Sequence, residues 1–282
     1  MENSIQNKKP EIVYHYTTMS ALYSIINGIK SNEDGSYFEL YATYYRFAND
    51  PTEYFFANEC IYEAIRTYED QQGEDHEASN MYKKVFDGVG GFLQEPFIVS
   101  FSALEDDLSM WRMYGGNGLG IAIGVDANSL MTAFKDEIFY PCTYKDRISF
   151  IEELNSEKIA KIFYEFSKKI VEEGPIYDTN MLRRILKYRL FIKQSCYSPE
   201  CEWRIALLRM MEDCGFREKN GMIIPYHSMK IPLDFLKKIY IGPCLDKDLH
   251  ELSLRNFIAA KFPEGTEDYP QIISSNLPYV IR

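Results

Sequence analysis

Short runs of β-branched and aromatic residues recur along this 282-residue chain at uneven spacings. Such runs are typical of β-strands. They do not alternate regularly with helical patterns, as a doubly wound parallel sheet requires, and they do not cluster as in a β-sandwich. The sequence therefore predicts an α+β protein with a mixed, mainly antiparallel sheet core and with inserted and flanking helices. The expected strands and extended segments cover residues 11–17, 37–47, 97–103, 119–125, 139–144, 202–210, 222–226, 238–241 and 271–273.

Helical periodicity and capping residues separate these strands. In Asn49-Asp50-Pro51, Asp50 can cap a helix whose first residue is the proline, and Glu53 can complete a capping box. Gly174-Pro175 breaks the longest helical stretch in two. The acidic stretch 69–77 is expected to form an exposed loop. The expected helices cover residues 19–29, 51–68, 78–86, 107–114, 127–134, 150–173, 179–196 and 246–262.

The division into domains follows from composition. Residues 1–10 are polar and charged, lack the apolar core of a signal peptide, and are expected to form a flexible N-terminus. Residues 11–282 are expected to form a single α+β domain with a helical insertion at about 149–197. No apolar run approaches the ~20 residues needed to cross a bilayer, so a cytoplasmic location without membrane association is expected.

Charge and cysteine usage limit the classes of partner. The net charge of −11 opposes non-specific attraction to nucleic acids and anionic membranes, because the summed field repels phosphate. The basic series in residues 183–193 is interpreted as one solvated helix face, although it could also steer a nucleotide or nucleic acid. None of the six cysteines forms a Cys-x-x-Cys pair, and no histidine stands at zinc-finger spacing from them, so no metal site is expected.

Four polar blocks lie among these aromatic strands. They are Tyr14-His15-Tyr16-Thr17, Asn49-Asp50-Pro51-Thr52-Glu53, the segment 100–118 and Glu200-Cys201-Glu202-Trp203-Arg204. Most have an ordinary structural interpretation. A single histidine in a strand is more often a hydrogen-bonded core residue than a catalytic one, and the second block caps a helix. The glycines at 115–118 form a turn, since their spacing and context do not fit a dinucleotide-binding loop.

The Glu200-x-Glu202 pair is harder to explain by structure alone. Side chains alternate along a strand, so a strand that includes both residues points the two carboxylates and Arg204 to one face. Cys201 and Trp203 then point the other way. Close carboxylates raise each other's proton affinity, a cost usually met by an arginine partner or by a function. Such a face suits a site lining, and it equally suits an edge strand with a row of surface salt bridges.

Five blocks appear in a characteristic order. They are His15-Tyr16-Thr17, Asn49-Asp50-Pro51-x-Glu53, Ser100-Phe101-Ser102 with Asp107-Leu108-Ser109-Met110-Trp111-x-x-Tyr114, Glu200-x-Glu202-Trp203-Arg204, and Ile239-Tyr240-Ile241-Gly242-Pro243. This set resembles a widespread bacterial family of domains of unknown function, over about residues 13–243. The family label brings little biochemistry, so the function is argued from the residues.

The order of His15, Ser100 with Ser102, and Glu202 is also similar, more loosely, to the ADP-ribosyltransferase fold. Those enzymes place a His or Arg on an early strand, a Ser-rich strand or an aromatic in the middle, and a Glu on a later strand. Two features depart from that pattern. Two long expected helices lie between Ser102 and Glu200, and the early histidine accompanies a Ser-x-Ser strand typical of the Arg-type enzymes.

The second resemblance implies NAD as the substrate and roles for individual side chains. Glu202 would hold the nicotinamide-ribose 2′-hydroxyl and stabilise the oxocarbenium ion, and Glu200 would orient or deprotonate the acceptor. His15 and Thr17 would bind a ribose, and an aromatic ring (Tyr16, Trp111 or Tyr114) would stack on nicotinamide. The residues expected to contact NAD are His15, Tyr16, Thr17, Ser100, Ser102, Trp111, Tyr114 and Arg204.

Three functions follow as hypotheses. The first is an ADP-ribosyltransferase, a toxin or phage-defence effector acting on an unknown macromolecule, in which His15, Glu202 and an aromatic converge on one cleft. The second is a non-enzymatic nucleotide- or partner-binding module, with both carboxylates exposed or locked in salt bridges and no cleft beside them. The third is a metal-dependent hydrolase of nucleotides or nucleic acids, with Glu200, Glu202 and either Asp50 or Glu53 as ligands.

Overall fold

The computed structural model describes residues 9–47, 51–87, 94–116, 119–156, 158–174, 179–219, 221–262 and 269–278, with the backbone alone at 51–54, 87, 179–182 and 184. Most of the expected flexible N-terminus therefore lies outside the described residues. The same holds for Asp50 and for the side chain of Glu53, so the expected capping box lies outside them too.

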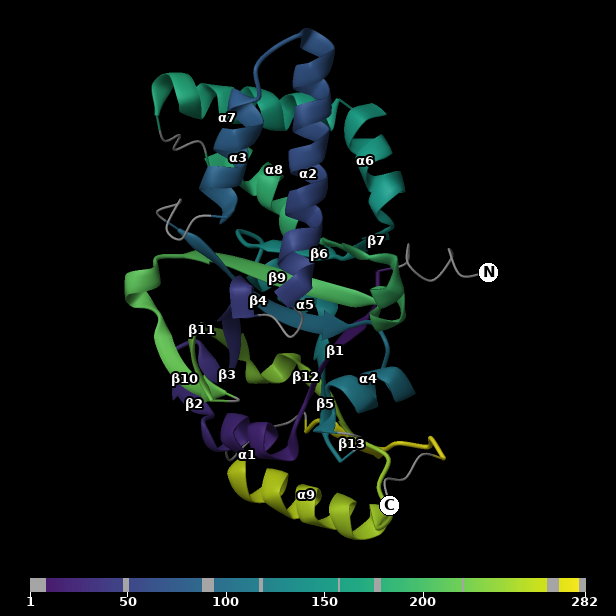
Figure 1. Cartoon of the computed structure of the whole chain (residues 1–282). Coiled ribbons are helices and arrows are strands. Elements are labelled where there is room, and N and C mark those ends of the chain that lie inside the picture. The colour runs from purple at the N-terminus through teal and green to yellow at the C-terminus, as the bar shows by residue number, and fades with distance from the viewer. Residues whose placement is uncertain are drawn as a thin grey trace.

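Eleven strands of the described chain form one sheet, and all of its pairings are antiparallel except that of β12 with β13. The order is β10-β11-β3-β4-β1-β5-β12-β13, in which β3 and β1 pair with different parts of one edge of β4. Strand β9 pairs with the opposite edge of β4, β6 pairs with β9, and β2 pairs with β3. This confirms the predicted α+β class and the mainly antiparallel sheet (Figure 1). The strands are β1 (Ile12–Thr17), β2 (Lys30–Asn32), β3 (Gly35–Tyr44), β4 (Glu95–Ser102), β5 (Ile121–Asp126), β6 (Ile138–Pro141), β9 (Glu202–Arg209), β10 (Gly215–Lys219), β11 (Met222–Pro232), β12 (Leu236–Ile241) and β13 (Gln271–Ser274).

The helices fall into two groups. At the top of Figure 1, α2 (Pro51–Gln72), α3 (Glu77–Asp87), α6 (Arg147–Ser156), α7 (Ile159–Glu173) and α8 (Thr179–Leu190) gather beside the sheet. They enclose a second apolar core, which includes Ile61, Tyr82 and Phe163, apart from the core over the sheet. The segment expected as an insertion thus packs with α2 and α3, while the single-domain organisation stays a prediction.

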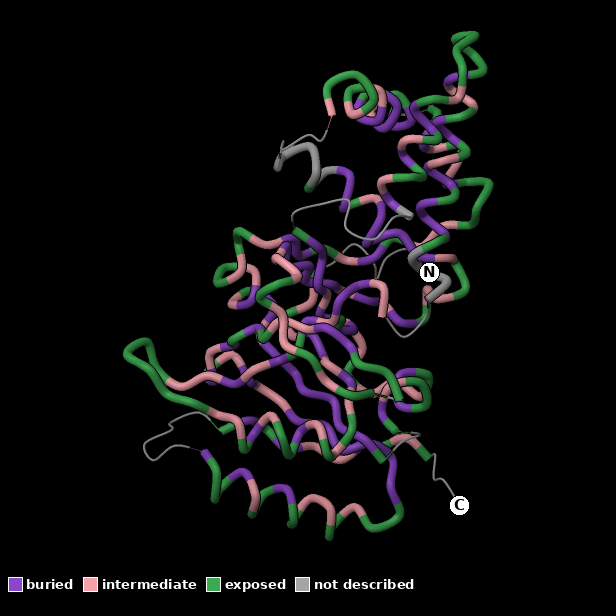
Figure 2. The backbone as a smooth tube through the Cα atoms, turned by 60° about the vertical axis from the view of Figure 1, so that its left-hand side comes forward, coloured by how far each residue is buried: buried purple, intermediate pink, exposed green. Residues whose placement is uncertain are grey.

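The second group of helices lies nearer the sheet. It comprises α1 (Met19–Asn27), α4 (Leu108–Met113), α5 (Ala127–Ala133) and α9 (Lys247–Lys261). Side chains cap two of these helices: Thr18 Oγ1 accepts a hydrogen bond from the Ala21 N–H, and the Asp107 carboxylate accepts from the N–H groups of Ser109 and Met110 in the first turn of α4. In the tube view, buried segments run through the middle of the lower part of the molecule, and α9, the lowest helix, has exposed residues along its outer turns (Figure 2).

Among the segments that differ from the sequence expectation, two do so because of long-range contacts. The expected loop 69–77 is wrong in its first part, since α2 continues to Gln72 and Glu69 is buried. The Glu69 carboxylate accepts hydrogen bonds from the N–H groups of Ala78 and Ser79, at 2.9 and 3.2 Å, and so caps α3. An acidic residue there is a helix cap rather than part of a solvated loop.

The expected helix 179–196 also ends early, at Leu190. The chain then forms the short strand β8 (Ile192–Gln194), which pairs in parallel with β7 (Thr143–Lys145), and a 3₁₀ turn at Ser195–Glu200. The interpretation of the basic series as one solvated helix face is therefore wrong at its C-terminal end. Arg189 is 4% and Lys193 is 1% exposed, because both side chains point into the protein.

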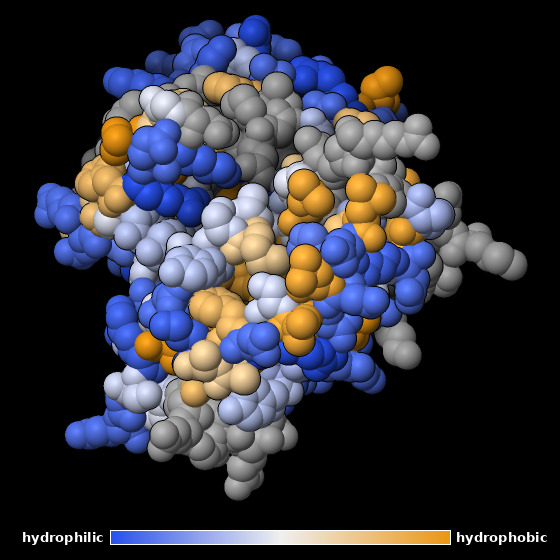
Figure 3. Space-filling model, turned by 90° about the horizontal axis from the view of Figure 1, so that it is seen from below, coloured by the Kyte–Doolittle hydropathy of each residue, from blue (hydrophilic) through white to orange (hydrophobic). Residues whose placement is uncertain are grey.

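Within the described residues, no helix is long and apolar enough to cross a membrane. The lower face, which α9 covers, carries exposed leucines at 245, 249 and 252. Seen from below, apolar groups on the surface are separated by polar ones (Figure 3).

Candidate functional site

A gap in strand pairing beside β4 positions the candidate site. On one edge, β9 pairs with β4 over its whole length. On the other edge, β3 pairs with Phe97 and Ile98, whereas β1 pairs at Ser102. Residues 99–101 have no strand partner on this second edge in the described chain. A cavity of about 870 Å³ opens there, with Ser100 in its wall.

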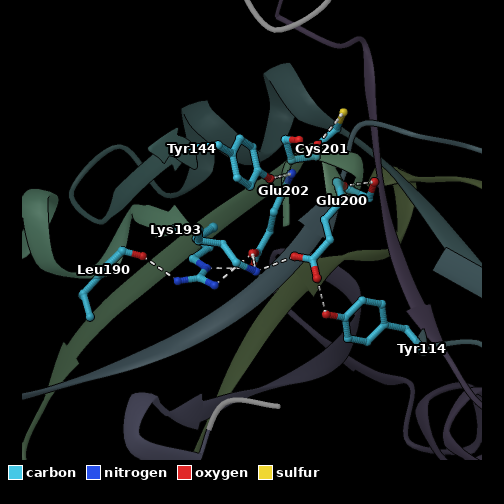
Figure 4. A network of polar contacts seen from close by, with 10 residues as sticks. Tyr114, Tyr144, Leu190, Lys193, Glu200, Cys201 and Glu202 are labelled. Carbon is cyan, nitrogen blue, oxygen red and sulfur yellow. Dashed lines mark hydrogen bonds and ion pairs between the residues drawn. The ribbon is translucent and has the colours of Figure 1, made fainter. Parts of the chain in front are cut away.

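Four charged side chains at the floor of this cavity form a buried cluster (Figure 4). Lys193 Nζ donates to Glu200 Oε2 and, at 2.8 Å, to Glu202 Oε2. Arg204 holds the other side of Glu202, with Nε donating to Oε1 at 2.7 Å and Nη2 donating to Oε2 at 2.9 Å. We call Lys193, Glu200, Glu202 and Arg204 the floor cluster. None of the four is more than 6% exposed.

Neutral groups fix the orientation of the floor cluster. Tyr114 donates its phenolic O–H to Glu200 Oε1 at 2.7 Å, and Ser102 Oγ donates to the Glu200 carbonyl at the same distance. The backbone N–H of Glu202 donates to Tyr144 OH at 2.7 Å, and Arg204 Nη1 donates to the Leu190 carbonyl at 2.6 Å. A network satisfied in this way holds a single arrangement of its charges.

The two carboxyl groups have opposite pKa shifts. Burial acts to raise the pKa of Glu202, but the charges of Arg204 and Lys193 outweigh it and hold the pKa at about 2. The pKa of Glu200 is raised, because burial outweighs the opposing effect of the Lys193 charge. The negative charge of Glu202 raises this pKa further. Glu202 is therefore the stably ionised member of the pair, and Glu200 is the member that takes up a proton more readily.

The two carboxylates meet for a reason that differs from the expected one. Strand β9 begins at Glu202, and Glu200 belongs to the preceding 3₁₀ turn. Between them Cys201 has φ +42°, a left-handed conformation rare for a residue other than glycine. This turn, and not strand alternation, directs both carboxylates to Lys193. The expectation of a shared strand face is correct for Glu202 and Arg204 and wrong for Glu200.

The wall of the cavity holds His15 from β1. Its Nδ1 atom lies 2.9 Å from the Ser100 carbonyl oxygen, in the stretch of β4 without a strand partner. A carbonyl oxygen only accepts hydrogen bonds, so Nδ1 carries the proton and the Nε2 lone pair of a neutral ring is free to accept. Burial lowers the pKa of His15, and the positive charges of Arg217 and Lys219 lower it further. The hydrogen bond to the Ser100 carbonyl acts in the opposite direction and raises it.

Most of the expected site residues line this one cavity. Ser102 and Trp111 do not line it, because both are fully buried. Trp111 Nε1 donates to Asp106 at 2.8 Å, and its ring meets Tyr16 edge-on with the centroids 4.8 Å apart. Trp111 therefore supports Tyr16 from behind and does not present a face to a ligand. The expected residues in the lining are His15, Tyr16, Thr17, Ser100, Tyr114, Glu200, Glu202 and Arg204.

Sequence reasoning missed four cations of the cavity lining, Lys30, Lys193, Arg217 and Lys219. Lys193 was assigned to a helix face, and only its register against β7 places it in the interior. Arg217 and Lys219 lie on β10, whose sequence GFREK lacks the β-branched residues that signal a strand. Their i, i+2 spacing would have indicated a shared face had the strand been recognised.

No group of three or more His, Cys, Asp or Glu side chains is placed to hold a metal ion within the described part of the chain. Of the ligands considered for a hydrolase, Glu200 and Glu202 already share Lys193 between them. The side chain of the third expected metal ligand, either Asp50 or Glu53, lies outside the described residues, since Asp50 is not described and Glu53 is described by its backbone alone.

Fold and site together define an α+β protein with a charged, buried cluster beneath a cavity. The model of a family described as protein of unknown function (DUF2971) matches residues 110–205, which include Tyr114 and the whole floor cluster. This confirms the resemblance to a family of domains of unknown function. No curated protein and no solved structure matches the chain, and the similarity to ADP-ribosyltransferases is not confirmed.

Proposed function

We propose that the protein is an NAD-dependent, ADP-ribosyltransferase-like enzyme, a toxin or phage-defence effector whose reaction takes place in this cavity. The observation that carries the proposal is the convergence of His15, Tyr114 and both floor carboxylates on one cavity. The sequence led us to expect this convergence for a transferase. The volume of about 870 Å³ also falls in the usual range of ligand sites, roughly 300–1,000 Å³.

In the proposed reaction, the bond between ribose C1′ and the nicotinamide nitrogen breaks, and its electron pair leaves with nicotinamide. Positive charge builds on the ribose, and a fixed carboxylate stabilises it. Glu202 suits this role because its low pKa keeps it ionised. Its Oε1 atom accepts one hydrogen bond from the described residues, from Arg204 Nε, so a lone pair remains for the ribose 2′-hydroxyl.

Two further groups complete the proposed mechanism. A nucleophile of the acceptor macromolecule forms the new bond to C1′ and gives its proton to Glu200, whose raised pKa suits a general base. His15 contributes the Nε2 lone pair as an acceptor for a ribose hydroxyl, since the Ser100 carbonyl fixes the proton on Nδ1. Tyr114 holds Glu200 in position through its phenolic hydroxyl.

A nucleotide-binding module without catalysis is the second candidate. The observation that favours it is the ion pairing of the floor cluster: Lys193 and Arg204 balance the two carboxylates without any substrate. In such a module the cluster would fix the shape of the cavity, and NAD or another nucleotide would bind without being cleaved.

The deciding experiment combines a thermal-shift titration with NAD and a nicotinamide-release assay on the wild type, Glu202→Gln and Glu39→Gln. Glu39 is a matched control, since it also lines the cavity but pairs with Lys30 at the rim. A bound ligand raises the melting temperature by mass action. The transferase requires a shift and nicotinamide release that is lost in Glu202→Gln but retained in Glu39→Gln.

Because Glu202→Gln disturbs a buried ion pair, its unfolding without ligand is measured first, and activity is compared at a temperature where all three proteins are folded. A thermal shift without nicotinamide release, in the presence of cell extract as a source of acceptor, would establish the binding module instead. The absence of both a thermal shift and nicotinamide release would reject NAD as the ligand.

A further inference from the structure

The described lining of the cavity carries more cations than carboxylates, and the floor cluster does not account for the difference. Its lining includes five cationic side chains and three carboxylates, in a chain of net charge −11. Lys193 and Arg204 are paired within the floor cluster, and Lys30 pairs with Glu39 at 3.3 Å. Arg217 and Lys219 on β10 are the other two cations of the described lining.

The nearest carboxylates on this part of the sheet are engaged elsewhere. Glu218, between the two cations, points to the opposite face of β10 by strand alternation, and its Oε1 accepts from the Gly221 N–H at 2.7 Å. Glu39 Oε1 binds Lys30, and its Oε2 accepts from Ser228 at 3.3 Å. No described carboxylate forms a salt bridge with Arg217 within 4 Å.

Arg217 is held in place with donors unused. Its Nη2 atom donates to Thr43 Oγ1 at 2.7 Å, and its guanidinium lies over the stacked rings of Tyr41 and Tyr226, at 5.5 and 6.0 Å from their centroids. Its Nε–H is buried and has no hydrogen-bond partner among the described residues. A buried charged donor left unpaired is costly, so this arrangement indicates a ligand that pairs with it.

The neighbouring like charges indicate the same kind of ligand. Lys219 lines the same cavity two residues along the same strand face. Each cation disfavours the charge of the other. The pKa of Lys219 illustrates this, because burial lowers it and the charge of Arg217 lowers it further. A single doubly charged anion between them would relieve this repulsion and would accept from the free donors of Arg217. The planar fork of arginine matches phosphate oxygens in geometry.

We propose that Arg217 and Lys219 form a phosphate-binding subsite at the rim of the cavity, so that its ligand is a free nucleotide with its phosphates on β10. The position of the glycosidic end of that nucleotide at the floor cluster rests on the proposed function, whereas the phosphate subsite does not. A free nucleotide fits better than a nucleic acid, because the net charge of −11 repels a polyanion.

The test is calorimetric binding of inorganic pyrophosphate and of ADP-ribose to the wild type, Arg217→Gln, Lys219→Gln and Lys230→Gln. Lys230 is the matched control, an exposed lysine on the neighbouring strand β11 that does not line the cavity. The expected result is that both probes bind, and that each rim variant weakens both by roughly tenfold to a hundredfold. Lys230→Gln should leave both affinities unchanged.

Several results would overturn the phosphate subsite. The first is that neither probe binds to the wild type. The second is that Arg217→Gln and Lys219→Gln bind both probes as tightly as the wild type does. The third is that Lys230→Gln weakens binding as much as the rim variants do. Tighter binding of a short single-stranded oligonucleotide than of ADP-ribose would replace the free nucleotide by a nucleic acid. Melting temperatures of the variants verify that each is folded.

The subsite and the proposed function fail in different ways. If pyrophosphate and ADP-ribose bind through Arg217 but NAD is not cleaved, the phosphate subsite stands and the transferase does not. If nicotinamide is released with the same KM in the wild type and in Arg217→Gln, the transferase stands and the subsite does not.

Discussion

Nδ1 of His15 lies 2.9 Å from the carbonyl oxygen of Ser100, where β4 has no strand partner on that edge in the described chain. The imidazole thus takes the place of a neighbouring strand as donor to this carbonyl. A neutral ring suffices for that bond, and the neutral form is favoured, because burial and the charges of Arg217 and Lys219 lower the pKa of His15.

The first prediction concerns the pH dependence of stability. The pKa of His15 is lower in the folded than in the unfolded protein, so the unfolded state binds more protons between the two values, and stability is lost as the pH falls below about 6.5. Asn at this position keeps a donor for Ser100 without titrating. Urea unfolding at about pH 7.5 and pH 5.5 should therefore show a larger acid loss in the wild type than in His15→Asn. Equal losses would show that His15 titrates normally.

The second prediction concerns Tyr114→Phe. Loss of the hydrogen bond to Glu200 Oε1 should lower the free energy of unfolding by roughly 1.5–3 kcal/mol, the usual contribution of a bond to a charged group. That bond lowers the pKa of Glu200, so its removal should also move the acid limb of a pH–activity profile to higher pH. Tyr140→Phe, at an exposed tyrosine, should change stability by less than about 0.5 kcal/mol. A stability loss without a displaced acid limb would make Tyr114 a purely structural residue.

The third prediction separates support from ligand contact at Trp111. Trp111→Phe removes the donor to Asp106 and part of a fully buried side chain, and should lower the free energy of unfolding by roughly 1–3 kcal/mol. Affinity for NAD, measured by calorimetry well below the melting temperature, should be unchanged. Lost NAD affinity at unchanged stability would instead restore Trp111 as a stacking platform.

Local signals in the sequence predicted much of the fold. Thr18 and Asp107 cap the helices expected to follow them, and the strands beginning near residues 12, 97 and 202 lie where β-branched and aromatic residues cluster. These features depend on side chains and backbone groups within a few residues of each other, which is why a sequence pattern can reveal them.

The arrangement of the candidate site depended on contacts that local patterns do not contain. Lys193 follows a genuine helical pattern, and only the pairing of β8 with β7 places it between the two carboxylates. Cys201 adopts a left-handed conformation that its residue type does not favour. Arg217 reaches the cavity because β11 pairs β10 with the rest of the sheet. The two carboxylates and Arg204 could be predicted from the sequence, but Lys193, Arg217 and Lys219 could not.

The last prediction concerns Lys193→Met, a change that keeps side-chain length and removes the charge between the two carboxylates. The variant leaves Glu200 and Glu202 buried with Arg204 alone, and removal of one partner from a buried ion pair costs about 3–5 kcal/mol near neutral pH. Without Lys193 the pKa of Glu200 should rise further, because burial and Glu202 already raise it and Lys193 is the largest opposing influence. A carboxyl group whose folded pKa lies above its unfolded value stabilises the protein below the unfolded pKa, and this contribution is lost as the pH rises through the folded pKa.

The deficit of Lys193→Met relative to the wild type should therefore shrink as the pH is lowered from about 7.5 to about 5 in urea unfolding experiments. The control is Lys187→Met, which removes an exposed lysine of α8 that lies over the ring of Tyr140, at 4.5 Å from its centroid. That change should cost less than about 1 kcal/mol at either pH, the usual limit for an exposed charge. A deficit in Lys193→Met that is the same at both pH values would mean that the floor carboxylates remain ionised without the lysine, and that Arg204 alone balances them.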